Sequence, residues 1–228
     1  SSQPTDNDYR VGTMARDVLA WIDHLGTDRV HLIGHDWGAA VAYVAGALAP
    51  DRILSLTTMA VPHAPRMMSA IWSVPTQVLN TWYMSFFQLP WLPEWTIERN
   101  DWAMGKWLSS KWSPGFSLSP EAWAHRREAF EGPGVKKAML AYYRQNVSPS
   151  VLLGLTPSET LSLKTVPVRT LILAGVNDGC MDIRLFEKVF FDEDFPCGHQ
   201  IIQIQEAGHF MHIDAPKIVN SAILNWIK

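Results

Sequence analysis

The segment Gly34-His35-Asp36-Trp37-Gly38 places a carboxylate between two glycines, after an apolar run and before a run of small residues. This is the G-x-nucleophile-x-G form of a strained strand-to-helix turn, in which the central side chain projects above the edge of a sheet. The N-terminus of the following helix favours an anion, so we expect Asp36 to be ionised. An ionised carboxylate in this position can attack a saturated carbon and form an ester that water then cleaves.

Cleavage of such an ester needs a base and a group that orients the base. His209 and Asp178 each follow a strand-like apolar run, and the chain order is therefore nucleophile, acid, histidine. All three residues fall just past the C-terminal end of a predicted strand, where open α/β sheets place their sites. Each residue alone could be a turn former, a helix cap or a structural histidine. Their joint order and placement favour a catalytic triad.

The elements that must position these residues follow from the apolar pattern. Helical spacing predicts a helix over 13–26, capped by Thr13 and ended by Gly26. Short apolar runs predict buried parallel strands at 29–35, 52–62, 168–175 and 199–208, with further helices at 38–50 and 215–228. Strands that alternate with helices indicate an α/β fold with a mostly parallel sheet and helices on both faces.

Residues 64–160 differ in composition from the rest of the chain. This interval holds eight of the 11 tryptophans and few β-branched runs. We interpret it as a helical cap inserted into a core made of residues 1–63 and 161–228. A tryptophan-rich layer can serve packing alone, or it can form the apolar wall of a pocket between two layers.

Composition excludes several other classes of function. The net charge of −3 provides no basic field for nucleic acid and no polybasic membrane signal. No apolar run is long enough to span a membrane, and the N-terminal residues lack the features of a signal peptide. The two cysteines, Cys180 and Cys197, form neither a disulfide framework nor a ligand set, so we expect a cytoplasmic protein. His209 and His212 lack a third ligand, and we expect neither a metal nor a cofactor.

Three segments carry a resemblance to a known family. The stretches GHDWGA, GVNDGC and GHFMHIDAP resemble the triad segments of α/β-hydrolase-fold epoxide hydrolases, whose relatives with the same nucleophile are the haloalkane dehalogenases. VPHAP at 61–65 is similar to the exit toward the cap in that family. The resemblance runs from DVLAWIDHLG to the last helix and implies the α/β-hydrolase fold with an inserted helical cap.

The resemblance also implies the remaining site residues. NTWYMSFFQLPWLPE and AMLAYYRQNV are similar to the segments that carry two proton-donating tyrosines, which places them at Tyr83 and Tyr143, with Tyr142 as the alternative to the latter. Both could instead be ordinary packing residues. The backbone N–H of Trp37 would supply half of an oxyanion hole. We expect the substrate to contact His35, Trp37, Trp82, Phe87 and Phe210.

The expected activity is hydrolysis of a small apolar or aromatic epoxide, with no nucleic-acid or membrane partner; a homodimer is compatible with this interpretation. One alternative is haloalkane dehalogenation by the same ester route. Another is a non-catalytic ligand receptor on the same fold. A fluoroacetate-type dehalogenase would carry Arg after the nucleophile, and Trp37 argues against it.

Family members carry about four strands before the helix at 13–26, with a His-Gly-x-Pro turn that completes the oxyanion hole. This sequence contains no such turn. We therefore expect the strand at 29–35 to lose one neighbour and to expose an apolar edge. A chain that truly lacked those strands is expected to fold poorly and to show little activity.

Overall fold

The computed structural model describes residues 3–228. Its sheet has four parallel strands in the order β1-β2-β3-β4. The strands are β1 (Val30–His35), β2 (Ile53–Met59), β3 (Thr170–Gly175) and β4 (His199–Ile204). The four predicted strands and their parallel arrangement are confirmed. Each strand is shorter than the apolar run that predicted it.

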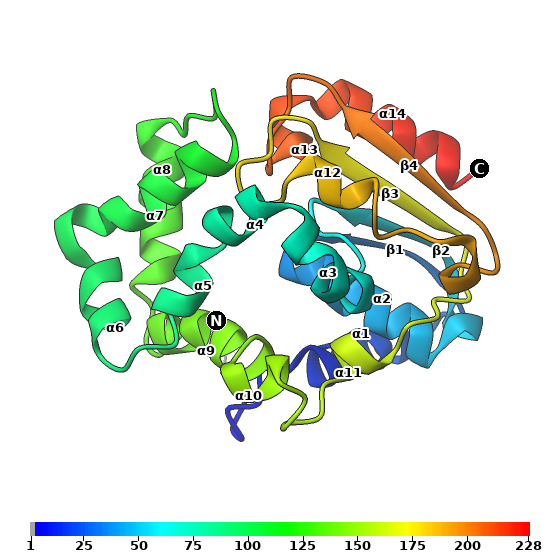
Figure 1. Cartoon of the computed structure of the whole chain (residues 1–228), viewed down its shortest axis with the longest axis horizontal. Helices are drawn as coiled ribbons and strands as arrows, with labels where there is room; N and C mark the ends of the chain where they lie inside the picture. The colour runs from blue at the N-terminus through cyan, green and yellow to red at the C-terminus, as the bar shows by residue number, and fades with distance from the viewer. Residues whose placement is uncertain (1–2) are drawn as a thin grey trace.

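Helices cover both faces of this sheet (Figure 1). Alternate residues of β3 face opposite ways: Leu171 and Leu173 pack with α14 (Pro216–Trp226), and Ile172 packs in a cluster shared with the cap interval. On the latter face, Leu56 of β2 packs against Tyr43 of α2 (Trp37–Leu48). Helix α1 (Val11–His24) packs on α2. The α/β fold class is confirmed.

Two local expectations are wrong. Helix α1 begins at Val11, so Thr13 lies inside it and donates a side-chain hydrogen bond to Asp8 instead of capping the start. Gly26 does end the helix, with a φ of +67°. The strand at 29–35 is less buried than its apolar run alone predicts: β1 is the edge strand of the described sheet, and Ile33 is 46% exposed. This agrees with the expectation that the strand lacks one neighbour and exposes an apolar edge.

All regular secondary structure between β2 and β3 is helical. Its helices are α3 (Ala64–Ala70), α4 (Pro75–Asn80), α5 (Trp82–Phe86), α6 (Leu92–Ile97), α7 (Arg99–Trp112), α8 (Pro120–Phe130), α9 (Val135–Asn146), α10 (Pro149–Leu152) and α11 (Glu159–Ser162), with a 3₁₀ turn at Ile71–Ser73. Helices α5 to α9 form a lobe beside the sheet in Figure 1. Proline in the first turn starts α4, α8 and α10, where a missing N–H costs nothing. The division of the chain into core and cap stays a prediction.

Four short elements complete the chain. They are α12 (Ile183–Phe186), α13 (Met211–Asp214) and 3₁₀ turns at Pro50–Arg52 and Asp192–Asp194. Arg66 of α3 forms an ion pair with the buried Asp194, which ties the start of the helical interval to the loop before β4.

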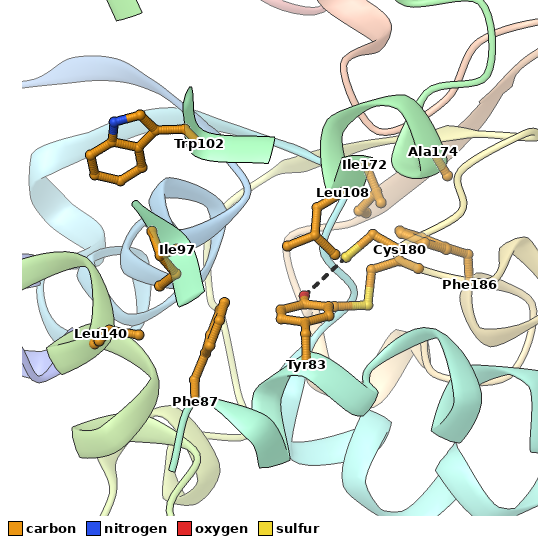
Figure 2. Packing of buried hydrophobic residues seen from close by; sticks show 11 residues of the cluster. Tyr83, Phe87, Ile97, Trp102, Leu108, Leu140, Ile172, Ala174, Cys180 and Phe186 are labelled. Carbon is orange, nitrogen blue, oxygen red and sulfur yellow. Dashed lines mark hydrogen bonds between the residues drawn. The ribbon is translucent and has the colours of Figure 1, made fainter. Parts of the chain in front are cut away.

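One apolar cluster joins the helical lobe to the sheet. Tyr83, Phe87, Leu108 and Cys180 belong to this cluster together with Ile172 of β3 (Figure 2). Of the eight tryptophans in this interval, Trp102 belongs to the buried part of the cluster, and Trp112 and Trp123 pack against it. Five others are exposed: Trp72, Trp82, Trp91, Trp95 and Trp107. Only three of the eight tryptophans therefore contribute to the packing layer.

Candidate active site

Asp36 lies in a tight turn between β1 and α2. Its φ of +53° is strained for a residue with a side chain, and its backbone N–H donates to the carbonyl of Met59 at 3.2 Å. A Cβ at position 34 would lie 2.2 Å from the carbonyl oxygen of Gly38, so this turn requires Gly34. Position 38 has open space around an added Cβ, so packing explains only the first of the two glycines.

The structure brings Asp36, Asp178 and His209 together. His209 Nδ1 lies 2.9 Å from Asp178 Oδ2, and its Nε2 lies 3.3 Å from Asp36 Oδ1. The other oxygen of Asp178 accepts the backbone N–H groups of Cys180 and Met181 at 2.7 and 2.9 Å. The imidazole is therefore held from one side by a fixed carboxylate and faces a second carboxylate with its other nitrogen.

Charge pairing dominates the electrostatics of this cluster. Burial lowers the pKa of His209, but Asp178 and Asp36 outweigh that effect and raise it to about 10. Burial raises the pKa of Asp36, but the hydrogen bond and charge of His209 bring it below its ordinary value. The backbone N–H of Trp37 adds a smaller lowering. The N-terminus of α2 thus lowers the pKa of Asp36 less than His209 does.

Tyr83 and Tyr143 line the same small cavity as Asp36, with a volume of about 80 Å³. Their rings lie 5.7 Å apart, and the ring of Tyr143 lies 5.2 Å from that of Trp37. The Tyr83 hydroxyl lies 3.3 Å from Cys180 Sγ, the contact drawn in Figure 2. Burial, with the charge of Asp36 adding to it, raises the pKa of both tyrosines, so both phenols are neutral and can donate protons.

The alternative tyrosine has a different environment. The ring of Tyr142 lies 5.6 Å from that of Tyr9 and 5.9 Å from that of Trp37, and it does not line the cavity of Asp36. The geometry therefore favours Tyr143 over Tyr142 as the second phenol beside the carboxylate.

The expected substrate contacts divide into two groups. Trp37 lines the cavity of Asp36, and Phe87 and Phe210 line a second cavity that shares Tyr143 with the first. Trp82 is not brought to either cavity: it is 44% exposed on the outer side of α5 and contacts Phe86 and Trp107.

His35 also lies away from both cavities, contrary to the expectation that it contacts substrate. Its Nε2 donates to the backbone carbonyl of His209 at 2.9 Å, and its ring contacts those of His209, Phe210 and His212. Burial lowers the pKa of His35 to about 4, so the ring is neutral. Its hydrogen bond and ring contacts hold the loop of His209 in place.

One contact that the sequence does not predict joins the helical interval to the loops of Asp178 and His209. The carbonyl of Trp112, at the end of α7, accepts the backbone N–H groups of both His209 and Gly179, at 2.9 and 3.1 Å. A Cβ at Gly179 or Gly208 would lie 2.0 to 2.5 Å from the backbone of residues 111–113. The only signal in the sequence is a glycine directly beside each of the two triad residues.

Asp178, Cys180 and His209 place three metal-ligating atoms within 4.8 Å of one another. His209 and Asp178 direct the relevant atoms at each other, and burial raises the pKa of the Cys180 thiol, which stays protonated. This donor set suits a hydrogen-bonded pair better than a metal site, where the thiolate would be the ligand.

The chain belongs to the α/β-hydrolase fold family, because the family's sequence model matches residues 1–216. It is 30% identical to the AB hydrolase superfamily protein YfhM of Bacillus subtilis, over 96% of this chain and 73% of that protein. It is 29% identical to human Epoxide hydrolase 4, over 96% of this chain and 59% of that protein. The chain thus spans about three fifths of the human relative. The resemblance inferred from the triad segments is confirmed.

Solved structures show the same fold. A mutant of an epoxide hydrolase from Bacillus megaterium superposes with a TM-score of 0.82 at 20% identity, covering 99% of this chain and 79% of that one. None of the helices in the described part of the chain is long and apolar enough to cross a membrane.

Proposed function

We propose that this protein hydrolyses epoxides to vicinal diols through an ester on Asp36. The observation that carries the proposal is the cavity in which Asp36 faces the neutral phenols of Tyr83 and Tyr143 while contacting His209. Displacement at an epoxide carbon needs a carboxylate nucleophile and an acid for the ring oxygen, and these residues supply both. Relatives named epoxide hydrolases support the same activity.

In the first step, Asp36 attacks one epoxide carbon and its C–O bond breaks. The ring oxygen takes a proton from a tyrosine, so an alkoxide does not accumulate. In the second step, His209 removes a proton from water, and the hydroxide attacks the ester carbonyl of Asp36. Backbone N–H groups such as that of Trp37 stabilise the tetrahedral oxyanion. Its collapse breaks the bond between the carbonyl carbon and the alkyl oxygen, and that oxygen takes the proton of the newly formed carboxyl group, which releases the diol and restores the carboxylate. The proton that His209 removed from water returns to the tyrosinate and restores the phenol.

Ester formation changes the protonation of His209. Two carboxylates raise the pKa of His209, and esterification of Asp36 removes the charge of one of them. The pKa of the imidazole therefore falls in the alkyl-enzyme, which favours the neutral base when hydrolysis of the ester requires it.

Haloalkane dehalogenation is the second candidate, because the Trp37 side chain lines the same cavity and indole N–H groups can hold a halide. Incubation with an aryl epoxide and with a bromoalkane separates the two activities: the proposal requires diol formation, whereas bromide release alone would replace it. A ligand receptor would produce neither product.

The decisive experiment traps the ester. His209→Gln should leave alkylation of Asp36 intact and stop hydrolysis, because the base is lost while the nucleophile remains. Mass spectrometry should show a substrate-sized adduct on the peptide that contains Asp36. His125→Gln, at an exposed histidine, is the control and should turn over without an adduct. An adduct on another peptide, or normal turnover of His209→Gln, would contradict the mechanism.

A further inference from the structure

A second cavity lies in the helical lobe and shares Tyr143 with the cavity of Asp36. It has a volume of about 360 Å³, within the range of small-molecule sites. At one end lie Tyr143, which also lines the cavity of Asp36, and Trp112, whose ring packs against that of His209. A molecule that reacts at Asp36 can therefore place its apolar body here.

The lining of this cavity is mainly apolar and includes one charged side chain. Most of it consists of aromatic, Leu, Ile and Met side chains from α6 to α9. Among the described residues that line it, Arg126 of α8 is the only charged one. Arg126 also lines an adjoining hollow of about 230 Å³, so its guanidinium lies where the two spaces meet.

Arg126 lacks the acidic partner that neighbouring cations have. Lys106 and Arg127 both pair with Asp101, and Arg127 also approaches Glu131. Within residues 3–228 no carboxylate forms an ion pair with Arg126, whose guanidinium lies 5.8 Å and 6.0 Å from the ring centres of Phe116 and Phe210. Burial alone lowers its pKa, which means that part of its hydration is lost and no acidic group offsets the loss.

We propose that Arg126 determines substrate specificity by binding an anionic group, in the simplest case a carboxylate, at the far end of an epoxide with an apolar body. The inference rests on the proposed function. A guanidinium at the end of an apolar cavity binds a carboxylate through charge-assisted hydrogen bonds, which are stronger than neutral ones. The anion also restores the solvation that burial removes from Arg126.

The test compares an epoxidised ω-unsaturated fatty acid with its methyl ester, which differ only in the charge of the end group. Arg126→Met should lower kcat/KM for the acid by about 10- to 100-fold, the range expected for a hydrogen bond to a charged group. The ester should change by less than about twofold. The loss should fall on KM, because the end group is remote from the reacting carbon and binds equally in ground and transition states.

Two matched variants separate charge from packing. Arg126→Lys should retain most of the preference for the acid. Arg127→Met, which removes the adjacent exposed arginine already paired with Asp101, should leave the preference unchanged. Equal loss for acid and ester in Arg126→Met, or a loss of similar size in Arg127→Met, would overturn the proposal.

A binding measurement makes the outcome independent of turnover. Equilibrium dialysis with the saturated fatty acid, which has no epoxide, should show weaker binding to Arg126→Met than to wild type or Arg127→Met. If the ester is turned over and the fatty acid binds equally well to wild type and Arg126→Met, the inference fails and the proposed function stands. If neither epoxide reacts but acid binding depends on Arg126, the proposed function fails and the anion site stands.

Discussion

Tyr83 and Tyr143 face the same carboxylate but differ in their surroundings. The Tyr83 hydroxyl contacts Cys180 Sγ, whereas the Tyr143 ring stands edge-on to those of Trp37 and Tyr83. Both phenols are neutral because burial raises their pKa values. Two donors at one oxygen make the site tolerant of the loss of either, so their contributions to the rate should not be additive.

We therefore expect Tyr83→Phe and Tyr143→Phe each to slow ring opening and the double variant nearly to abolish it. One lost donor in a catalytic site typically costs about 10²–10³ in rate, and the remaining phenol should make each single loss milder. Tyr142→Phe is the control and should retain the rate. Single-turnover measurement of alkyl-enzyme formation tests this, and full ring-opening activity in the double variant would exclude the tyrosines as the acids.

The sequence could predict which site residues lie together where chain order fixes the geometry. Asp36, Asp178 and His209 each follow a parallel strand, and such strand ends meet at one edge of a sheet. Trp82 and His35 were misplaced because neighbouring positions on a helix or turn face different ways. A one-residue step along α5 separates Tyr83 in the cavity from Trp82 on the surface.

At the scale of elements, the end of α7 connects the helical lobe to the loops of Asp178 and His209. The carbonyl of Trp112 accepts N–H groups from two loops, and the Ser113 hydroxyl accepts the backbone N–H of Phe210 at 2.8 Å. The loops of Asp178 and His209 are therefore positioned by the helical interval as well as by the sheet. Sequence patterns could not show this, because such a contact joins backbone atoms that are far apart along the chain.

Gly208→Ala tests this connection. The added methyl group would lie 2.5 Å from Ser113 Cα, so the His209 loop and the end of α7 must separate. We expect the free energy of unfolding to fall by about 1–3 kcal/mol, as in overpacked sites, and ester hydrolysis to slow more than alkylation because His209 moves.

Denaturant unfolding and single-turnover kinetics measure the two effects. Gly105→Ala is the control for stability, because helix α7 leaves open space around the added methyl group. Alanine there should be neutral or stabilising by up to about 1 kcal/mol. If Gly208→Ala and Gly105→Ala had the same free energy of unfolding, the contact at Gly208 would not be tight.

At the scale of the whole molecule, periodicity predicted the sheet and its helices but not the exposure of each strand. Strand β3 is buried at every residue, while β1 is largely accessible although its sequence is similarly apolar. The difference arises from strand order, since β3 has neighbours on both sides and β1 pairs only with β2 within the described sheet. Burial of a strand depends on its partners as well as on its own composition.

Buried histidines make the stability of the whole molecule depend on pH in opposite directions. His63, packed between Tyr43 and Phe195, has its pKa lowered to about 4 by burial, as does His35. Their ordinary pKa is 6.5, so the unfolded chain binds more protons below that pH and stability falls as pH decreases. His209 has a raised pKa of about 10, so its contribution is complete below pH 6.5 and is lost as pH rises toward 10.

We therefore expect maximal stability near pH 6.5–7. On the alkaline side, the single proton of His209 gives a slope of up to about 1.4 kcal/mol per pH unit, and on the acid side His35 and His63 together give up to about twice that. Urea unfolding between pH 5 and 9 measures both slopes. His209→Gln should flatten the alkaline side, because its proton no longer distinguishes the folded from the unfolded chain. His63→Gln should roughly halve the acid slope and leave the alkaline one unchanged. If His209→Gln retained the alkaline slope, the ion pairs with Asp36 and Asp178 would not be what raises the pKa of this histidine in the folded protein.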